Sequence, residues 1–109
     1  MEGSSFRQFP RTELDKPVEI RIGKETLRVE TPANNLSIGG VFVGRSDLPV
    51  GSSVHVRIPI HHHVFEADGR IDNASQCGAG IEFAKLSEAE LDTLYELIED
   101  LTLRGLAAA

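Results

Sequence analysis

Residues 79–103, AGIEFAKLSEAELDTLYELIEDLTL, contain the change of pattern that decides the fold. As far as Phe83 the apolar residues alternate with others, which is typical of a strand with one buried face. After Ser87 the apolar residues recur at helical spacing instead. The sequence therefore predicts a last strand at residues 79–83 and then a helix from about Glu88 to Leu103, with one apolar face formed by Leu91, Leu94, Ile98 and Leu101.

Local signals mark both ends of this helix. Ser87 and Glu90 have the spacing of a capping box, in which each side chain accepts a hydrogen bond from the backbone N–H of the other residue. Leu86 and Leu91 flank this cap as a hydrophobic staple would. Gly105 is the predicted stop, because glycine is common just after the last helical turn.

The segments before residue 79 are short, rich in valine and isoleucine, and alternate with charged residues in the manner of half-buried strands. A turn at residues 23–24 joins the first two in a hairpin, and we expect a bulge at Gly69 in the longest one. Six strands in so short a chain need one buried face and protected edges, so we expect an all-β fold, a six-stranded antiparallel β-barrel with one C-terminal α-helix. The predicted strands are residues 16–22, 25–31, 41–43, 54–60, 64–75 and 79–83.

The composition is that of a single soluble domain of 109 residues with a net charge of −6. We expect a flexible leader at residues 1–15, the barrel and helix at residues 16–105, and a disordered tail at residues 106–109. The chain has no signal peptide and no apolar run long enough to span a membrane, so we expect a cytoplasmic protein. It also lacks the basic field of proteins that bind DNA or RNA. The net negative charge does not exclude a small anionic ligand, because exposed charges more than about 8–10 Å from its site are largely screened.

The leader contains FRQFPR, residues 6–11, in which two arginines stand four positions apart. Pro10 disfavours a helix here, so Arg7 and Arg11 would converge only by wrapping around a ligand. A guanidinium can donate two hydrogen bonds to a phosphate or to a guanine edge, and it can stack on a base. Two interpretations stay open for this segment alone, an anion clamp and ordinary solvated charge.

A second polar segment, NNLSIGG at residues 34–40, precedes a short strand. In an extended chain Asn35 and Ser37 would point the same way and form a small polar shelf. Gly40 and Gly39 would let a ring or a phosphate approach the backbone closely. The alternative is a plain loop whose polar side chains bond to their own backbone.

Taken together and in order, RxxxR, NxSxxG and the strand GAGIEF before a helix resemble the PilZ domain family over most of the chain. The resemblance implies a barrel with a C-terminal helix and a bacterial receptor for cyclic di-GMP. It implies that Arg7 and Arg11 contact phosphates and guanine edges, that Asn35 and Ser37 hold a guanine and its neighbouring phosphate or sugar, and that Gly40 keeps the surface beneath the nucleotide open. Further candidate ligand residues are Phe6, Gln8 and Gly39.

The family pattern has either Asp or Asn at the first position of this loop, and this chain has Asn35. The Asn35 side chain offers one carbonyl oxygen to the N–H donors of a guanine, whereas an aspartate would offer a carboxylate with two acceptor oxygens. The resemblance further implies a mobile arginine segment that folds over the ligand, and an output passed to a separate partner protein in the control of motility, adhesion or biofilm polysaccharide. We expect a monomer or a weak dimer.

Other features of the sequence allow different functions. An interaction module on the same fold that binds no nucleotide is the main alternative. We expect His61, His62 and His63 to form a solvent-exposed turn rather than a metal site, because consecutive histidines rarely converge on one ion and no further ligand lies at zinc-like spacing. We expect Cys77 to be a small buried or half-buried thiol rather than a nucleophile, and His55 to be a surface residue. The sequence contains no catalytic constellation, so we expect neither an enzyme nor a cofactor.

Overall fold

The computed structural model describes residues 11–30, 34–59 and 64–108. It contains one antiparallel sheet and one helix, α1 (Glu88–Ala108). An all-β fold with one C-terminal helix is confirmed, whereas the number of strands is eight rather than six. The strands are β1 (Thr12–Glu13), β2 (Val18–Ile22), β3 (Glu25–Val29), β4 (Asn35–Leu36), β5 (Gly40–Val43), β6 (Ser53–Pro59), β7 (Val64–Ser75) and β8 (Gly78–Phe83).

The two additional strands, β1 and β4, have two residues each and pair with one another. Two residues are too few to show an alternating pattern, so periodicity could not reveal them. β1 also shows that the predicted leader of residues 1–15 is too long, because the chain joins the sheet at Thr12 and buries Leu14 to 2% exposure.

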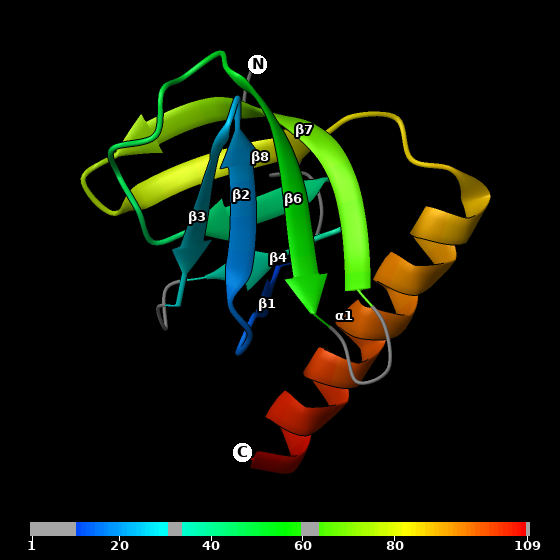
Figure 1. The fold of residues 1–109 in the computed structure, drawn as a ribbon. Coiled ribbons are helices and arrows are strands. Elements are labelled where there is room, and N and C mark those ends of the chain that lie inside the picture. Colours follow the sequence, from blue (N-terminus) through cyan, green and yellow to red (C-terminus); the bar gives the residue numbers. More distant parts are fainter. Residues whose placement is uncertain (1–10, 31–33, 60–63, 109) are drawn as a thin grey trace, which may run out of the picture.

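The order of strands in the sheet is β1-β4-β5-β8-β7-β6-β2-β3. Figure 1 shows that the sheet curls into a half-barrel, with α1 running past the ends of β7 and β1. The β2–β3 hairpin therefore lies at one end of the sheet, although in the sequence it falls between β1 and β4, at the other end.

The core follows the alternation in the sequence. In β6 the residues Val54, Val56 and Ile58 are buried and their neighbours are not, and β7 repeats this pattern from Phe65 to Ile71. Register between these two strands is set because a shift of one residue would turn every apolar side chain toward solvent. The bulge in β7 lies between Ile71 and Asn73 and not at Gly69, which pairs regularly with both neighbouring strands.

The helix adds Leu94, Leu97 and Leu101 to the core, while Leu91 and Ile98 lie at its margin. The capping box forms as predicted, with Ser87 N donating to Glu90 Oε1 at 2.7 Å and Glu90 N donating to Ser87 Oγ at 3.1 Å.

The predicted end of the helix at Gly105 is wrong, because α1 continues to Ala108 and includes residues 106–108 of the expected tail. A glycine inside a helix costs only about 1 kcal/mol relative to alanine, and the leucine and alanines that follow favour the helix.

Candidate functional site

The pairing of β1 with β4 brings the end of the arginine segment to the NxSxxG loop. Thr12 pairs with Leu36, and Glu13 pairs with Asn35. Arg11 directly precedes this pair of strands and Ser37 directly follows it, so the antiparallel register places Arg11 beside Ser37. The Arg11 side chain is exposed. Arg11 and the NxSxxG loop, which are separated by the β2–β3 hairpin in the sequence, are thus neighbours at one end of the sheet.

Asn34, which was not among the predicted site residues, links this end of the sheet to β3 at the other end. It is fully buried, and its Nδ2 donates to the backbone oxygen of Val29 at 3.1 Å. Its Oδ1 accepts from the backbone N–H of Gly44 at 3.0 Å, and its backbone oxygen accepts from the N–H of Leu14 at 2.9 Å. One residue therefore ties the end of β3, the end of β5 and the segment after β1 together.

The adjacent polar residues of the loop differ in burial. Asn35 is half-buried in β4, opposite Phe42 of β5. Ser37 has 1% of its surface exposed, and both its backbone N–H and its hydroxyl donate to the backbone oxygen of Gly40, at 2.9 and 3.4 Å. Ser37 thus bonds to its own loop, as in the alternative interpretation, and its contact with a ligand stays a prediction.

Gly40 is required by the packing of the sheet itself. A Cβ at this position would overlap the backbone oxygen of Ile81 in the neighbouring strand β8. The next glycine, Gly39, accepts a hydrogen bond from the N–H of Phe83 at 2.9 Å. Gly40 therefore allows β5 and β8 to approach closely, which is a reason for this glycine that holds with or without a ligand.

The helix borders the same site. The hydroxyl of Thr102 in α1 donates to the hydroxyl of Thr12 in β1 at 3.5 Å. Since Thr12 follows Arg11 directly, the arginine segment enters the fold at the line where the sheet meets the helix (Figure 1).

Three predicted ligand residues, Phe6, Arg7 and Gln8, lie outside the described residues, as does the histidine run 61–63. Among the residues that are described, no group of His, Cys, Asp and Glu side chains is arranged to hold a metal ion. The expectation that Cys77 is buried or half-buried is wrong, because it is an exposed free thiol in the turn between β7 and β8. Within the same residues, no helix is both long and apolar enough to cross a membrane.

The outer face of β6 and β7 carries a further polar cluster that was not predicted from the sequence. His55 Nε2 lies 2.8 Å from Glu66 Oε1, and its Nδ1 lies 2.9 Å from Asp68 Oδ1. Hydrogen bonds to Glu66 and then to Asp68 raise the pKa of His55, and the bond from His55 lowers the pKa of Glu66. The alternation of two neighbouring strands could have revealed this cluster, because it places all three side chains on one face.

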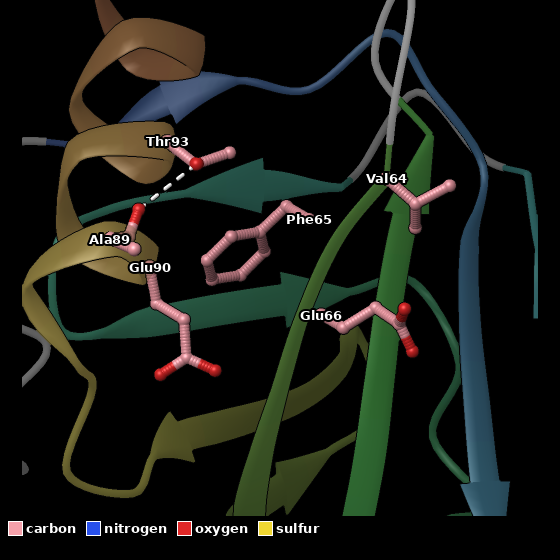
Figure 2. A pocket seen from close by; sticks show the side chains of 6 residues that line it. All are labelled: Val64, Phe65, Glu66, Ala89, Glu90 and Thr93. Atoms are coloured by element: carbon pink, nitrogen blue, oxygen red, sulfur yellow. Dashed lines mark hydrogen bonds between the residues drawn. The ribbon is translucent and has the colours of Figure 1, made fainter.

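The cavity in Figure 2 offers little to an anion. It has a volume of about 220 Å³ and lies between the start of β7 and the first turns of α1, with Phe65 extending toward the helix. Two of its six lining side chains, Glu66 and Glu90, are carboxylates, which would repel a phosphate. A smaller cavity of about 80 Å³ on the outer face of β2 and β6 is lined by two arginines and a histidine, and one of those arginines is paired with Glu19.

Comparisons with known proteins agree with this fold. The PilZ domain family matches residues 5–100 of the chain. No curated protein matches the chain significantly.

Among solved structures, the PilZ domain of CeSA from a cellulose-synthesising bacterium is similar with a TM-score of 0.70 and 20% identity, covering 85% of this chain and 98% of that one. The PilZ domain with c-di-GMP of YcgR from Escherichia coli has a TM-score of 0.73 and 16% identity, with coverage of 91% and 93%. The Bacillus subtilis inhibitor of motility (MotI/DgrA) has a TM-score of 0.67 and 20% identity, and the match covers 95% of this chain but 54% of that one. With the family matching residues 5–100 and the fold shared with these structures, the chain belongs to the PilZ domain family.

Proposed function

We propose that this chain is a receptor for cyclic di-GMP that passes the signal to a separate protein. The observation that carries the proposal is the register of β1 with β4, which sets Arg11 beside the loop that contains Asn35 and Ser37. PilZ domains form a family of cyclic di-GMP receptors, and the similar YcgR domain was solved with c-di-GMP.

In the proposed complex, Arg7 and Arg11 donate to phosphate oxygens and guanine edges and stack on the bases. Asn35, which is half-buried in β4, donates and accepts along the edge of one guanine. Ser37 orients the loop and supplies a hydroxyl to the neighbouring phosphate or sugar, and Gly40 keeps the loop against β8. Phe6, Gln8 and Gly39 lie next to these residues in the sequence and complete the proposed site.

The energetic requirement is that ligand contacts offset the ordering of the arginine segment. Ordering costs roughly 1–2 kcal/mol per residue in lost conformational entropy. Hydrogen bonds to charged groups contribute about 1.5–3 kcal/mol each, and each guanidinium can make more than one. Removing either arginine should therefore weaken binding severely.

The test is calorimetric titration of the protein with cyclic di-GMP, with GTP and cyclic AMP as control ligands. We expect Arg7→Ala and Arg11→Ala each to lower the affinity at least about tenfold, which corresponds to the ~1.4 kcal/mol of a single charge-assisted bond.

Arg21→Ala is the matched control, because Arg21 is an exposed arginine on β2, which pairs with β3 and β6 and not with β1 or β4. It should leave the affinity within about twofold. Unchanged binding in both arginine variants, or no binding by the unaltered chain, would contradict the proposal and favour the interaction module that binds no nucleotide.

A further inference from the structure

The outward side of α1 carries a surface that the nucleotide site does not use. Its exposed side chains are those opposite the buried leucines of the helix, and we call them together the acidic helix face: Glu88, Asp92, Tyr95, Glu96, Glu99 and Leu103. Tyr95 and Leu103 are two of the three large apolar side chains that are prominently exposed among the described residues, at 56% and 60%.

The acids of this face form no ion pair with the other described residues. Between Lys85 and Arg104 the helix region has six acidic residues and no Lys, Arg or His.

Several of these acids are also unfavourable to the helix that bears them. Asp92 stands four residues before Glu96, and Glu96 stands three before Glu99, and like charges at these spacings weaken a helix. Beside them a depression of about 500 Å³ is lined by Tyr95 and Ile98 together with three of the acids. Ile98 also packs against the core, but the exposed Tyr95 ring and the carboxylates around it do not help the fold, so the shape and charge of the depression are better explained by a partner.

The negative charge of the acidic helix face restricts the kinds of partner that could bind there. A second copy of this chain would bring the same acids against themselves, with a net charge of −6 on each copy. Nucleic acids and anionic membranes would be repelled for the same reason. A cationic segment with apolar side chains would neutralise the carboxylates and cover Tyr95.

We propose that the acidic helix face binds a basic amphipathic segment of a partner protein. Residues 88–103 extend about 23 Å at 1.5 Å per residue, which matches a helix of about four turns. Lysine or arginine side chains of that segment pair with Asp92, Glu96 and Glu99, and an apolar side chain packs against Tyr95. The proposal requires no nucleotide, so it is tested without one.

The probe is a 16-residue amphipathic peptide of lysine and leucine, titrated into the ¹⁵N-labelled chain and followed by NMR. We expect shift changes concentrated at residues 92–103 and an affinity that falls with added salt. Glu99→Lys should weaken binding about tenfold and Tyr95→Ala about fivefold.

The matched control is Glu25→Lys, which makes the same change of charge at an exposed acid of β3. It should change the affinity less than twofold. Loss of binding in Glu99→Lys cannot come from unfolding if circular dichroism is unchanged, and we expect it to be, because Lys at this position turns a repulsive pair with Glu96 into an attractive one.

Three results would overturn the proposal. The first is no binding of the peptide, or shift changes away from α1. The second is an equal loss in Glu99→Lys and Glu25→Lys, which would show that only net charge matters. The third is sedimentation of the chain as a dimer that Glu99→Lys dissociates, which would make a second copy the occupant.

Discussion

The two adjacent asparagines of the NNLSIGG loop differ in what they contact. Asn34 is buried and bonds to the backbone of Val29 and Gly44, whereas Asn35 is half-buried and is a predicted ligand residue. A buried backbone group that loses its partner costs about 1–3 kcal/mol.

Asn34→Ala should therefore lower the free energy of unfolding by roughly 2–4 kcal/mol, because two backbone groups lose their partner. The expected fall in Tm is about 10 °C or more for a domain of this size. Thermal unfolding measures it, with Asn35→Ala as the control at the neighbouring position. Similar losses in the two variants would show that Asn34 does not hold the strands as described.

His55 gives a prediction about pH. Its pKa is raised above the ordinary 6.5 by Glu66 and Asp68, so the stability that it contributes is complete below pH 6.5 and is lost as the pH rises through its raised pKa. The pKa of Glu66 is lowered from 4.5, so its contribution is present above pH 4.5 and is lost as the pH falls further. The cluster should stabilise the protein most between these values, by less than about 1 kcal/mol because it is largely exposed.

The direct measurement is an NMR titration of the His55 ring, which should give a pKa above 6.5. The pH profile of stability should flatten above pH 6.5 in His55→Gln. Arg57 lies 3.5 Å from Glu66 and is present in both the unaltered protein and the His55→Gln variant, so it does not account for a difference between their pH profiles. A ring that titrates at or below 6.5 would contradict the observed bonding.

At the scale of elements, β1 is the strand that connects the proposed ligand segment with the fold. Its two residues make few backbone bonds, so its position depends on Leu14, which is buried directly after it. The contact of Thr12 with Thr102 adds the helix as a second neighbour.

Leu14→Ala should lower the free energy of unfolding by about 2–5 kcal/mol, as is usual for a leucine removed from a core. The same substitution at Leu103, 60% exposed on α1, should change it by less than about 0.5 kcal/mol. Chemical denaturation of both variants tests this difference. If Leu14→Ala were as mild as Leu103→Ala, the chain before β2 would not be part of the core.

For the whole molecule, the sequence predicted the features that depend on repetition. Six strands, the helix start at Ser87 and most of its apolar face follow from patterns of several residues, and the structure contains them. The arrangement at Asn34 could not be predicted, because an asparagine in a loop has the same local signature whether it bonds to distant strands or to water. The same holds for Gly40, whose steric role depends on Ile81, far along the chain.

The candidate site was predictable by residue type and order, and not by geometry. Nothing local in the sequence shows that Arg11 comes to lie beside Ser37, because their proximity depends on β1 and β4, whose partners are set by tertiary structure. The candidate ligand residues were therefore chosen from the resemblance of the motifs to the PilZ family, because the periodicity of the sequence does not identify them.

The contact of Thr12 with Thr102 joins residues that are 90 positions apart. During synthesis the amino-terminal residues emerge first, and β1 can pair with β4 long before α1 exists. Leu94, Leu97 and Leu101 reach the core only when the last fifth of the chain has been made. We therefore expect the strands to emerge from the ribosome with an apolar face that α1 has not yet covered, and a premature stop codon before Leu94 to yield an aggregating product rather than a shortened folded domain.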